Sequence, residues 1–314
     1  MAQSTIGIDA EYRTLREDAG LLDRSDRARL TVHGSEAGEF LQGQLTNDVE
    51  GLGPGEGCYA ALLDRKGKIR ADMRVLRTDS DRFLIDTEGA CGELVLSHLQ
   101  MYKVGRDAAV EDSTADSGLL SLIGPRSEEI AGAPIRPEHA HRELTIGGVA
   151  CRAIATDIGI DLLVPRDGLG PVGAALVDAG AEPIGIEAAE IARVEAGRPR
   201  VGYEIGAGTM PQEAGINERA VSFTKGCYIG QETVARLHYK GKPNRHLRKL
   251  ALEHPVAEGD PVSMDGRAVG TIGTAVLSPA GGPLALAILR REAEPGAEVI
   301  VGDGVPAKVV ESGA

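Results

Sequence analysis

The 314-residue sequence contains no tryptophan, and aromatic residues make up only 3% of it. A core built on many large rings is therefore excluded, and the interior must consist mainly of Leu, Val, Ile and Ala side chains. Hydrophobic residues still make up 42% of the chain, which is ordinary for a globular protein. A chain of this length can bury a large core without disulfides or metal ions, and its length predicts two or three compact units.

Basic residues are also in short supply, with 34 Lys and Arg against 47 Asp and Glu, and the net charge is −13. A general nucleic-acid-binding protein is disfavoured, because binding to the phosphate backbone depends on clustered positive charge. One segment departs from this balance, since residues 236–249 read RLHYKGKPNRHLRK. Such a stretch is compatible with a site for an anionic ligand or partner, and equally with a solvated loop.

Cysteine is scarce, and the four cysteines (Cys58, Cys91, Cys151 and Cys227) form no CxxC pair. No histidine stands at zinc-ligand spacing from any of them. The first residues lack a basic start followed by an apolar run, and no segment approaches 18 consecutive apolar residues. We therefore expect free thiols, no metal site, no membrane span and a cytoplasmic location.

The common nucleotide-binding and hydrolase motifs are missing as well. The sequence contains no GxxxxGK[ST], no HExxH and no GxSxG. The glycines at 51–57 do not have GxGxxG spacing and do not follow a good strand. ATP binding and dinucleotide binding are therefore disfavoured.

The hydrophobic pattern predicts an α+β protein rather than alternating βαβ units. For the first part of the chain we expect helices at 8–20, 35–45 and 89–101, the second with Ser35 as its N-cap. Strands are expected at 28–33, 58–63, 69–76 and 82–86, with a hairpin turn at 64–67.

A second α+β unit is expected further along the chain, with strands at 119–123, 145–156 and 160–165 and helices at 169–180 and 186–196. After Pro243, short strand-like runs alternate with Gly and Pro turns, which is typical of a small β-barrel or sandwich. We therefore predict three domains, at 1–117, 118–242 and 243–314.

The segment 222–236, SFTKGCYIGQETVAR, is the densest in chemical groups. Lys225 brings a cation two residues before Cys227, and a nearby ammonium lowers a thiol's pKa. This pattern is compatible with a reactive cysteine in a tight turn. It is also compatible with a cysteine that serves only as a small hydrophobic residue.

The same segment resembles the K-G-C-[FY]-x-G-Q-E signature of YgfZ-type proteins, which are relatives of the glycine-cleavage T-protein, an aminomethyltransferase. The resemblance extends along most of the chain. Further matches to the family's patterns are FLQGQLTNDV at 40–49, DRKGKI at 64–69, RVEAGRP at 193–199, MPQE at 210–213 and the region 270–279.

The resemblance implies a GcvT-like fold: a three-lobed ring of two related α+β lobes and a C-terminal β-barrel, with tetrahydrofolate in a central hole. It implies a folate-binding accessory protein for iron–sulfur cluster assembly or repair, supporting tRNA-modifying iron–sulfur enzymes. Its partners would then be iron–sulfur client or assembly proteins. The alternative is a folate-dependent aminomethyltransferase or another one-carbon transferase of the T-protein type. A third possibility is a binding module that has lost folate.

The resemblance also implies site residues. Cys227 and Asp72 are the expected catalytic residues. Asp72, which follows the hairpin glycine, is expected to meet the pterin through paired hydrogen bonds. Contacts with the cofactor are likewise expected from Asp161, Arg193, Lys225 and Tyr228.

Two positions depart from the T-protein pattern, and both favour the accessory role over aminomethyl transfer. Ala71 stands where the T-protein pattern has an acid, and Ala189 stands where it has an arginine.

Overall fold

The structure is a computed structural model that describes residues 7–132 and 134–311. The chain divides into two compact units. The first comprises the described residues up to Asp64 together with Arg70–Ala188 and Arg219–Ile229. The second comprises Arg65–Ile69, Ala189–Glu218 and the residues from Gly230 onward. This division into two units does not test the three domain boundaries predicted from the sequence, which stay a prediction.

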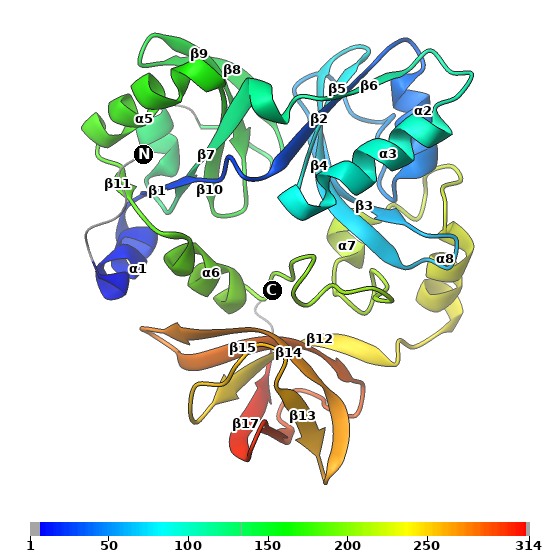
Figure 1. Cartoon of the computed structure of the whole chain (residues 1–314), viewed down its shortest axis with the longest axis vertical. Coiled ribbons are helices and arrows are strands. Elements are labelled where there is room, and N and C mark those ends of the chain that lie inside the picture. Colours follow the sequence, from blue (N-terminus) through cyan, green and yellow to red (C-terminus); the bar gives the residue numbers. More distant parts are fainter. Residues whose placement is uncertain (1–6, 133, 312–314) are drawn as a thin grey trace. The chain divides into compact units, whose positions relative to one another are not determined.

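The first unit contains a five-stranded sheet with the strand order β3-β4-β5-β2-β6 (Figure 1). Its strands are β2 (Ala28–His33), β3 (Gly57–Leu63), β4 (Ile69–Asp79), β5 (Arg82–Thr87) and β6 (Ala109–Asp112). The helices that pack on it are α2 (Ala37–Gln44) and α3 (Gly92–Tyr102), the latter preceded by a 3-10 turn at Gly89–Cys91. The strands expected at 28–33, 58–63, 69–76 and 82–86 are confirmed.

A second, six-stranded sheet in this unit has the order β11-β1-β7-β10-β9-β8. Its strands are β1 (Gly20–Asp23), β7 (Ser117–Ile123), β8 (His141–Ile146), β9 (Val149–Ala155), β10 (Gly159–Pro165) and β11 (Glu182–Pro183). The helices of this half are α1 (Ile8–Glu17), α4 (Ser127–Ala131) and α5 (Leu169–Asp178), with 3-10 turns at Thr114–Asp116 and Arg166–Gly168. The short strand β1, which the sequence did not predict, pairs antiparallel with β7.

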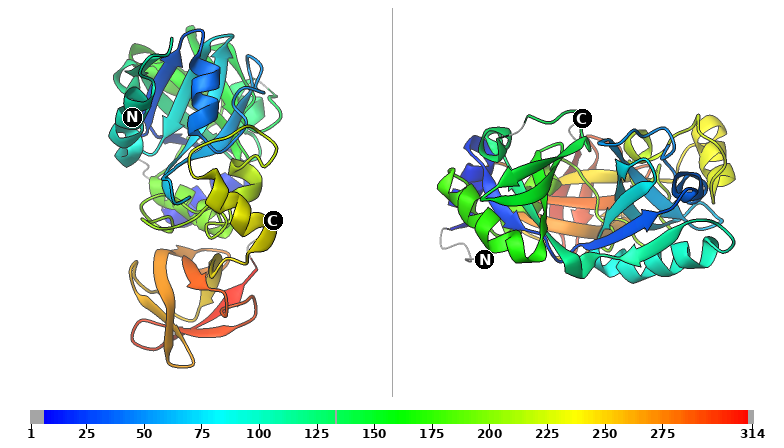
Figure 2. Two further views of the ribbon diagram at one scale, coloured as in Figure 1. Left: turned by 90° about the vertical axis from the view of Figure 1, so that its right-hand side faces the viewer. Right: turned by 90° about the horizontal axis from the view of Figure 1, so that it is seen from above.

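The second unit contains a closed barrel with the strand order β12-β15-β14-β13-β16-β17 (Figure 2). Its strands are β12 (Arg245–Leu252), β13 (Pro261–Met264), β14 (Arg267–Ser278), β15 (Gly282–Arg290), β16 (Glu298–Val301) and β17 (Val305–Val310). The remaining helices are α6 (Ile186–Glu195), α7 (Asn217–Ala220) and α8 (Gln231–Lys240). The predicted α+β content with a C-terminal barrel is confirmed, and no helix of the described chain is long and apolar enough to cross a bilayer.

One expected helix cap is wrong. Helix α2 follows Glu36, whose side chain makes no cap bond. Ser35 instead donates its hydroxyl to Asp107 at 2.5 Å. The Ser35 hydroxyl therefore links the turn between β2 and α2 to the segment that precedes β6.

Alternation along β4 places two kinds of side chain on its two faces. Ala71, Met73 and Val75 are fully buried on one face. Asp72 and Arg74 belong to the other face. There Leu76 forms an apolar cluster with Leu84 of the same sheet and with Ile154 and Leu163 of the other sheet.

A charged network lies beside this cluster and joins the two sheets of the first unit. Arg74 of β4 donates to Asp86 of β5 and to Asp161 of β10, each at 2.8 Å. Arg27 adds a second guanidinium to Asp86 at 2.7 Å and also pairs with Glu88. Because Arg74, Asp86 and Asp161 are buried, the three charges depend on one another for compensation.

We expect Arg74→Met to lower the free energy of unfolding by about 3–5 kcal/mol, because it leaves the carboxylates of Asp86 and Asp161 without their shared cation. Urea denaturation measures the loss. Arg126→Met is the control, since Arg126 pairs with Asp18 and Glu129 at the surface, where ion pairs contribute little to stability, and its loss should be much smaller. Equal losses in the two variants would contradict the expectation.

The network also predicts an acid-sensitive step in stability. Burial raises the pKa of Asp86, but Arg27 and Arg74 more than offset this and lower it from 3.8 to about 2. A lowered folded-state pKa stabilises the protein above the unfolded value, and this contribution disappears as pH falls from about 4 towards 2. Urea titrations at several pH values should therefore show a steeper loss over this window for the wild type than for Asp86→Asn. If the stability of the two proteins depended on pH in the same way, the lowered pKa of Asp86 would be refuted as the cause.

Candidate functional site

The first unit pairs Asp72 with a tyrosine. The Tyr59 hydroxyl donates to Oδ2 of Asp72 at 2.5 Å, from β3 to the adjacent strand β4. Both residues are half-buried. The backbone carbonyl of Asp72 accepts a bond from the Thr87 hydroxyl at 2.6 Å, which fixes the strand at this point.

Asp72 has the properties of a carboxyl that can exchange a proton. Burial raises its pKa above the usual value, although the Tyr59 hydroxyl and the Arg27 guanidinium both favour the carboxylate. Burial, followed by the Asp72 charge, likewise raises the pKa of Tyr59 well above 10. Tyr59 therefore remains a neutral hydrogen-bond donor, and Asp72 is the member of the pair that can titrate.

Tyr59 also makes a contact through the face of its ring. The Arg219 guanidinium lies 5.5 Å from the centre of the Tyr59 ring, within the range of a cation–π contact. Arg219 is itself fixed by an ion pair with Glu138 at 2.5 Å. Tyr59 is thus held at its hydroxyl by Asp72 and at its ring by Arg219.

Asp161, expected to contact the cofactor, is bonded to other side chains of the protein. Its Oδ2 accepts from Arg74 at 2.8 Å and its Oδ1 accepts from the Ser121 hydroxyl at 2.6 Å. Its Oδ2 therefore joins the two sheets, and its Oδ1 is bonded within the six-stranded sheet. Its contact with a cofactor stays a prediction.

Lys225 is engaged with the backbone. Its ammonium donates to the carbonyls of Gln42, Leu45 and Asn47 at 2.6, 2.7 and 2.9 Å. An ammonium has three donors, so these bonds use all of them. The ammonium also lies 5.1 Å from the ring centre of the buried Tyr228. Burial lowers the pKa of Lys225 to about 8.

Cys227, two residues beyond this anchored lysine, is the exposed member of the four free cysteines. Cys91 and Cys151 are buried and Cys58 is half-buried. Burial raises the pKa of Cys58 to about 12, which keeps that thiol protonated near neutral pH.

Arg193 is fully engaged within the second unit. Its five N–H donors meet Glu190 twice, the Arg198 carbonyl, Glu204 and the Thr274 hydroxyl at 2.6–3.1 Å. A guanidinium has five donors, so these partners saturate it. The structure gives Arg193 the role of joining α6 to β14, and its contact with a cofactor stays a prediction.

The neighbouring Glu204 explains why residue 273 is a glycine. The Glu204 side chain is fully buried, and a Cβ added at Gly273 would lie 2.9 Å from its Cγ. A larger side chain at this position would therefore collide with Glu204. Glycine at 273 is the residue that this packing requires.

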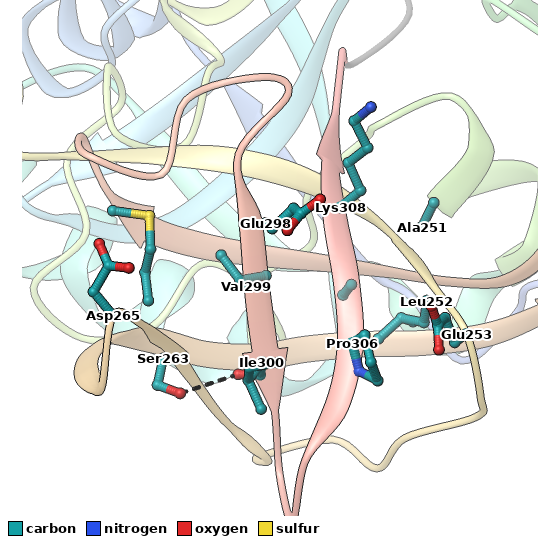
Figure 3. Close-up of a pocket in the computed structure, with 12 residues that line it drawn as sticks. Ala251, Leu252, Glu253, Ser263, Asp265, Glu298, Val299, Ile300, Pro306 and Lys308 are labelled. Carbon is teal, nitrogen blue, oxygen red and sulfur yellow. Dashed lines mark hydrogen bonds between the residues drawn. The ribbon is translucent and has the colours of Figure 1, made fainter.

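The barrel carries a pocket of about 630 Å³ (Figure 3). Strands β12, β13, β16 and β17 contribute its lining, which includes the acids Glu253, Asp265 and Glu298 and the base Lys308. None of the residues expected at the site lines it. It is therefore not the site that the family resemblance implies.

Sequence reasoning missed Tyr59, which donates to Asp72, and Arg219, which contacts the Tyr59 ring. Tyr59 could have been suspected, because only six tyrosines occur in the chain and this one precedes the DRKGKI hairpin. Arg219 is 160 residues away from Tyr59 in sequence, and no local pattern links them.

The geometry defines a titratable acid, Asp72, that accepts from the Tyr59 hydroxyl, with the Arg219 guanidinium on the Tyr59 ring, in an α+β protein with a C-terminal barrel. The GCVT N-terminal domain family matches residues 2–225. The chain belongs to this family, whose members include glycine-cleavage aminomethyltransferases.

Curated relatives cover almost the whole chain. An aminomethyltransferase of Synechococcus sp. (strain RCC307) is 31% identical, over 99% of this chain and 91% of its own. An aminomethyltransferase of Rubrobacter xylanophilus is also 31% identical, over 97% of this chain and 85% of its own. The crystal structure of aminomethyltransferase T from Bartonella henselae shares the fold, with a TM-score of 0.88, 22% identity, and coverage of 98% of this chain and 90% of its own.

These comparisons correct the expected function. The prediction of an accessory protein for iron–sulfur assembly, with iron–sulfur clients and a link to tRNA modification, is wrong. The relatives that match nearly the full chain are named aminomethyltransferases. The eight-residue signature at 225–232 is too short a part of the chain to outweigh them.

We expect one fast-reacting thiol per folded chain with a disulfide reagent such as Ellman's reagent at pH 8, and none in Cys227→Ser. Exposure makes Cys227 accessible, whereas burial protects Cys91 and Cys151 and a raised pKa keeps the half-buried Cys58 protonated. Unfolding in denaturant should release all four thiols in the wild type and serves as the control. A second thiol of equal rate in the folded protein would contradict this arrangement.

Proposed function

We propose that this protein binds a reduced folate and transfers a one-carbon unit to it, as an aminomethyltransferase of the T-protein type. The observation that carries the proposal is the Tyr59–Asp72 pair in a chain of the GCVT family. The names of the relatives support the reaction class.

The residues of the first unit fit a pterin. The carboxyl of Asp72 offers acceptors for the amidine-like donor edge of the ring. His139, the neighbour of Glu138, has a buried Nδ1 with no hydrogen-bond partner in the described chain, so it offers one more polar contact. Burial, with the charges of Arg74 and Arg219, lowers the pKa of His139 to about 4, which keeps it neutral at pH 7.

Tetrahydrofolate, when bound, would supply the nitrogen nucleophiles that accept the one-carbon unit. Asp72 would bind the pterin and hold or release a proton at its carboxyl. Tyr59 would keep this carboxyl oriented by its hydroxyl, and Arg219 would keep the Tyr59 ring in place. This division of roles needs no chemistry from Cys227.

The segment 225–232 supports a finer proposal about ancestry, namely that the chain belongs to the YgfZ-type branch of the family. This proposal concerns descent and does not restore an iron–sulfur role. Robust transfer activity would show that a chain with this signature retains the T-protein reaction.

Asp72→Asn should weaken tetrahydrofolate binding about 10- to 100-fold under reducing conditions, because it removes charge-assisted hydrogen bonds of about 1.5–3 kcal/mol. Titration calorimetry measures the change. Asp79→Asn is the matched control, since Asp79 is an exposed acid at the far end of the same strand and should bind like the wild type.

The transfer step is tested with an aminomethyl-loaded lipoyl carrier protein and tetrahydrofolate, by measuring methylenetetrahydrofolate and ammonia. The wild type should form both products, and Asp72→Asn should not. Saturable folate binding without product would remove the transferase part of the proposal, and the absence of binding would remove all of it.

A further inference from the structure

The anchoring of Lys225 and the pair at Asp72 are linked through one residue, Asn47. The backbone carbonyl of Asn47 accepts from the Lys225 ammonium at 2.9 Å. Its side-chain amide donates to the backbone carbonyls of Tyr59 at 2.8 Å and Arg219 at 3.0 Å. Asn47 thus contacts the lysine on one side and both members of the cation–π pair on the other.

The link matters because Tyr59 and Arg219 come from segments far apart in the chain. Both hydrogens of the Asn47 amide are used, one on each partner, so the two backbones are held at a fixed separation. The Arg219 guanidinium can then cover the Tyr59 ring, and the Tyr59 hydroxyl can reach Asp72.

Neighbouring bonds hold the same segment. The Thr46 hydroxyl donates to the carbonyl of Ala220 at 2.6 Å and accepts from the amide of Ala61 at 2.8 Å. The amide of Ser222 donates to the Thr46 carbonyl at 3.0 Å. The strand β3, the α2–β3 connection and the segment 219–225 are therefore fastened to one another.

We propose that Asn47 and Lys225 form a clasp that positions Tyr59 and Arg219, and through them sets the carboxyl of Asp72. In this role Lys225 and Asn47 are positioning residues that do not touch substrate. The Lys225 ammonium, saturated by three carbonyls, serves the clasp. The link to folate rests on the proposed function, whereas the effect on Asp72 does not.

The first test is independent of folate. The Asp72 carboxyl is titrated by carbon-13 NMR in aspartate-labelled protein, and Asp72→Asn identifies its signal. In Asn47→Ala and Lys225→Met the titration midpoint of Asp72 should move upward, because the Tyr59 hydroxyl that favours the carboxylate is no longer held against it. Lys225→Arg retains donors for the carbonyls and should restore most of the wild-type midpoint.

Val172→Ala is the matched control for lost stability. Val172 is fully buried in α5, on the other side of the six-stranded sheet from Asp161, and its truncation costs core packing without touching the clasp. The Asp72 midpoint should be unchanged in this variant. A midpoint that stays at the wild-type value in both Asn47→Ala and Lys225→Met would overturn the proposal.

The second test adds tetrahydrofolate. Asn47→Ala should weaken its binding about tenfold, which corresponds to about 1.4 kcal/mol, and shift the pH dependence of binding in step with the Asp72 midpoint. Val172→Ala should bind like the wild type. If the wild type fails to bind folate, the proposed function falls while the NMR titration still decides the clasp. If the wild type binds and Asn47→Ala matches it in affinity and pH dependence, the clasp has no role in positioning.

Discussion

The first unit depends on one buried cation, the guanidinium of Arg74. It lies between a carboxylate of its own sheet and a carboxylate of the other sheet, at 2.8 Å from each. Two sheets that met through apolar side chains alone could slide over each other with little change in buried area. A cation that must satisfy Asp86 and Asp161 at once allows one arrangement, because any shift leaves a buried charge uncompensated.

The candidate site lies on the same face of β4, two residues before Arg74. The contact of Arg74 with Asp86 and Asp161, which fixes the two sheets, therefore also fixes the position of Asp72. Arg27, which pairs with Asp86, also favours the charged form of Asp72. The clasp of Asn47 and Lys225 constrains the hydrogen-bond donor of Asp72, by fixing the backbones of Tyr59 and Arg219. The acid is thus constrained through its strand and through its hydrogen-bond donor, which is what a preorganised binding group requires.

Much of the fold could be predicted from the sequence, because hydrophobic alternation and the turn at 64–67, which ends in Gly67, are local signals. The short strand β1 was missed because four residues carry too little pattern. The roles of Asp161 and Arg193 could not be predicted, since an acid or an arginine looks the same in sequence whether it meets a ligand or a buried partner. The partners here, Arg74 and Glu204, are supplied by tertiary structure. The functional error had a different origin: the short segment 225–232 resembles the signature of one branch of the family, and this resemblance was taken to define the activity.

The two faces of β4 bear on the departure at Ala71. Ala71 is fully buried on the face that also carries Met73 and Val75, opposite the face of Asp72 and Arg74. An acid at 71 would point into this apolar layer, where its charge would have no partner. Alanine at 71 therefore removes no carboxylate from the face on which Tyr59 meets Asp72. The departure at Ala71 was expected to count against aminomethyl transfer, but in this chain it reflects packing of the core, and the acid that we propose for the site is present at 72.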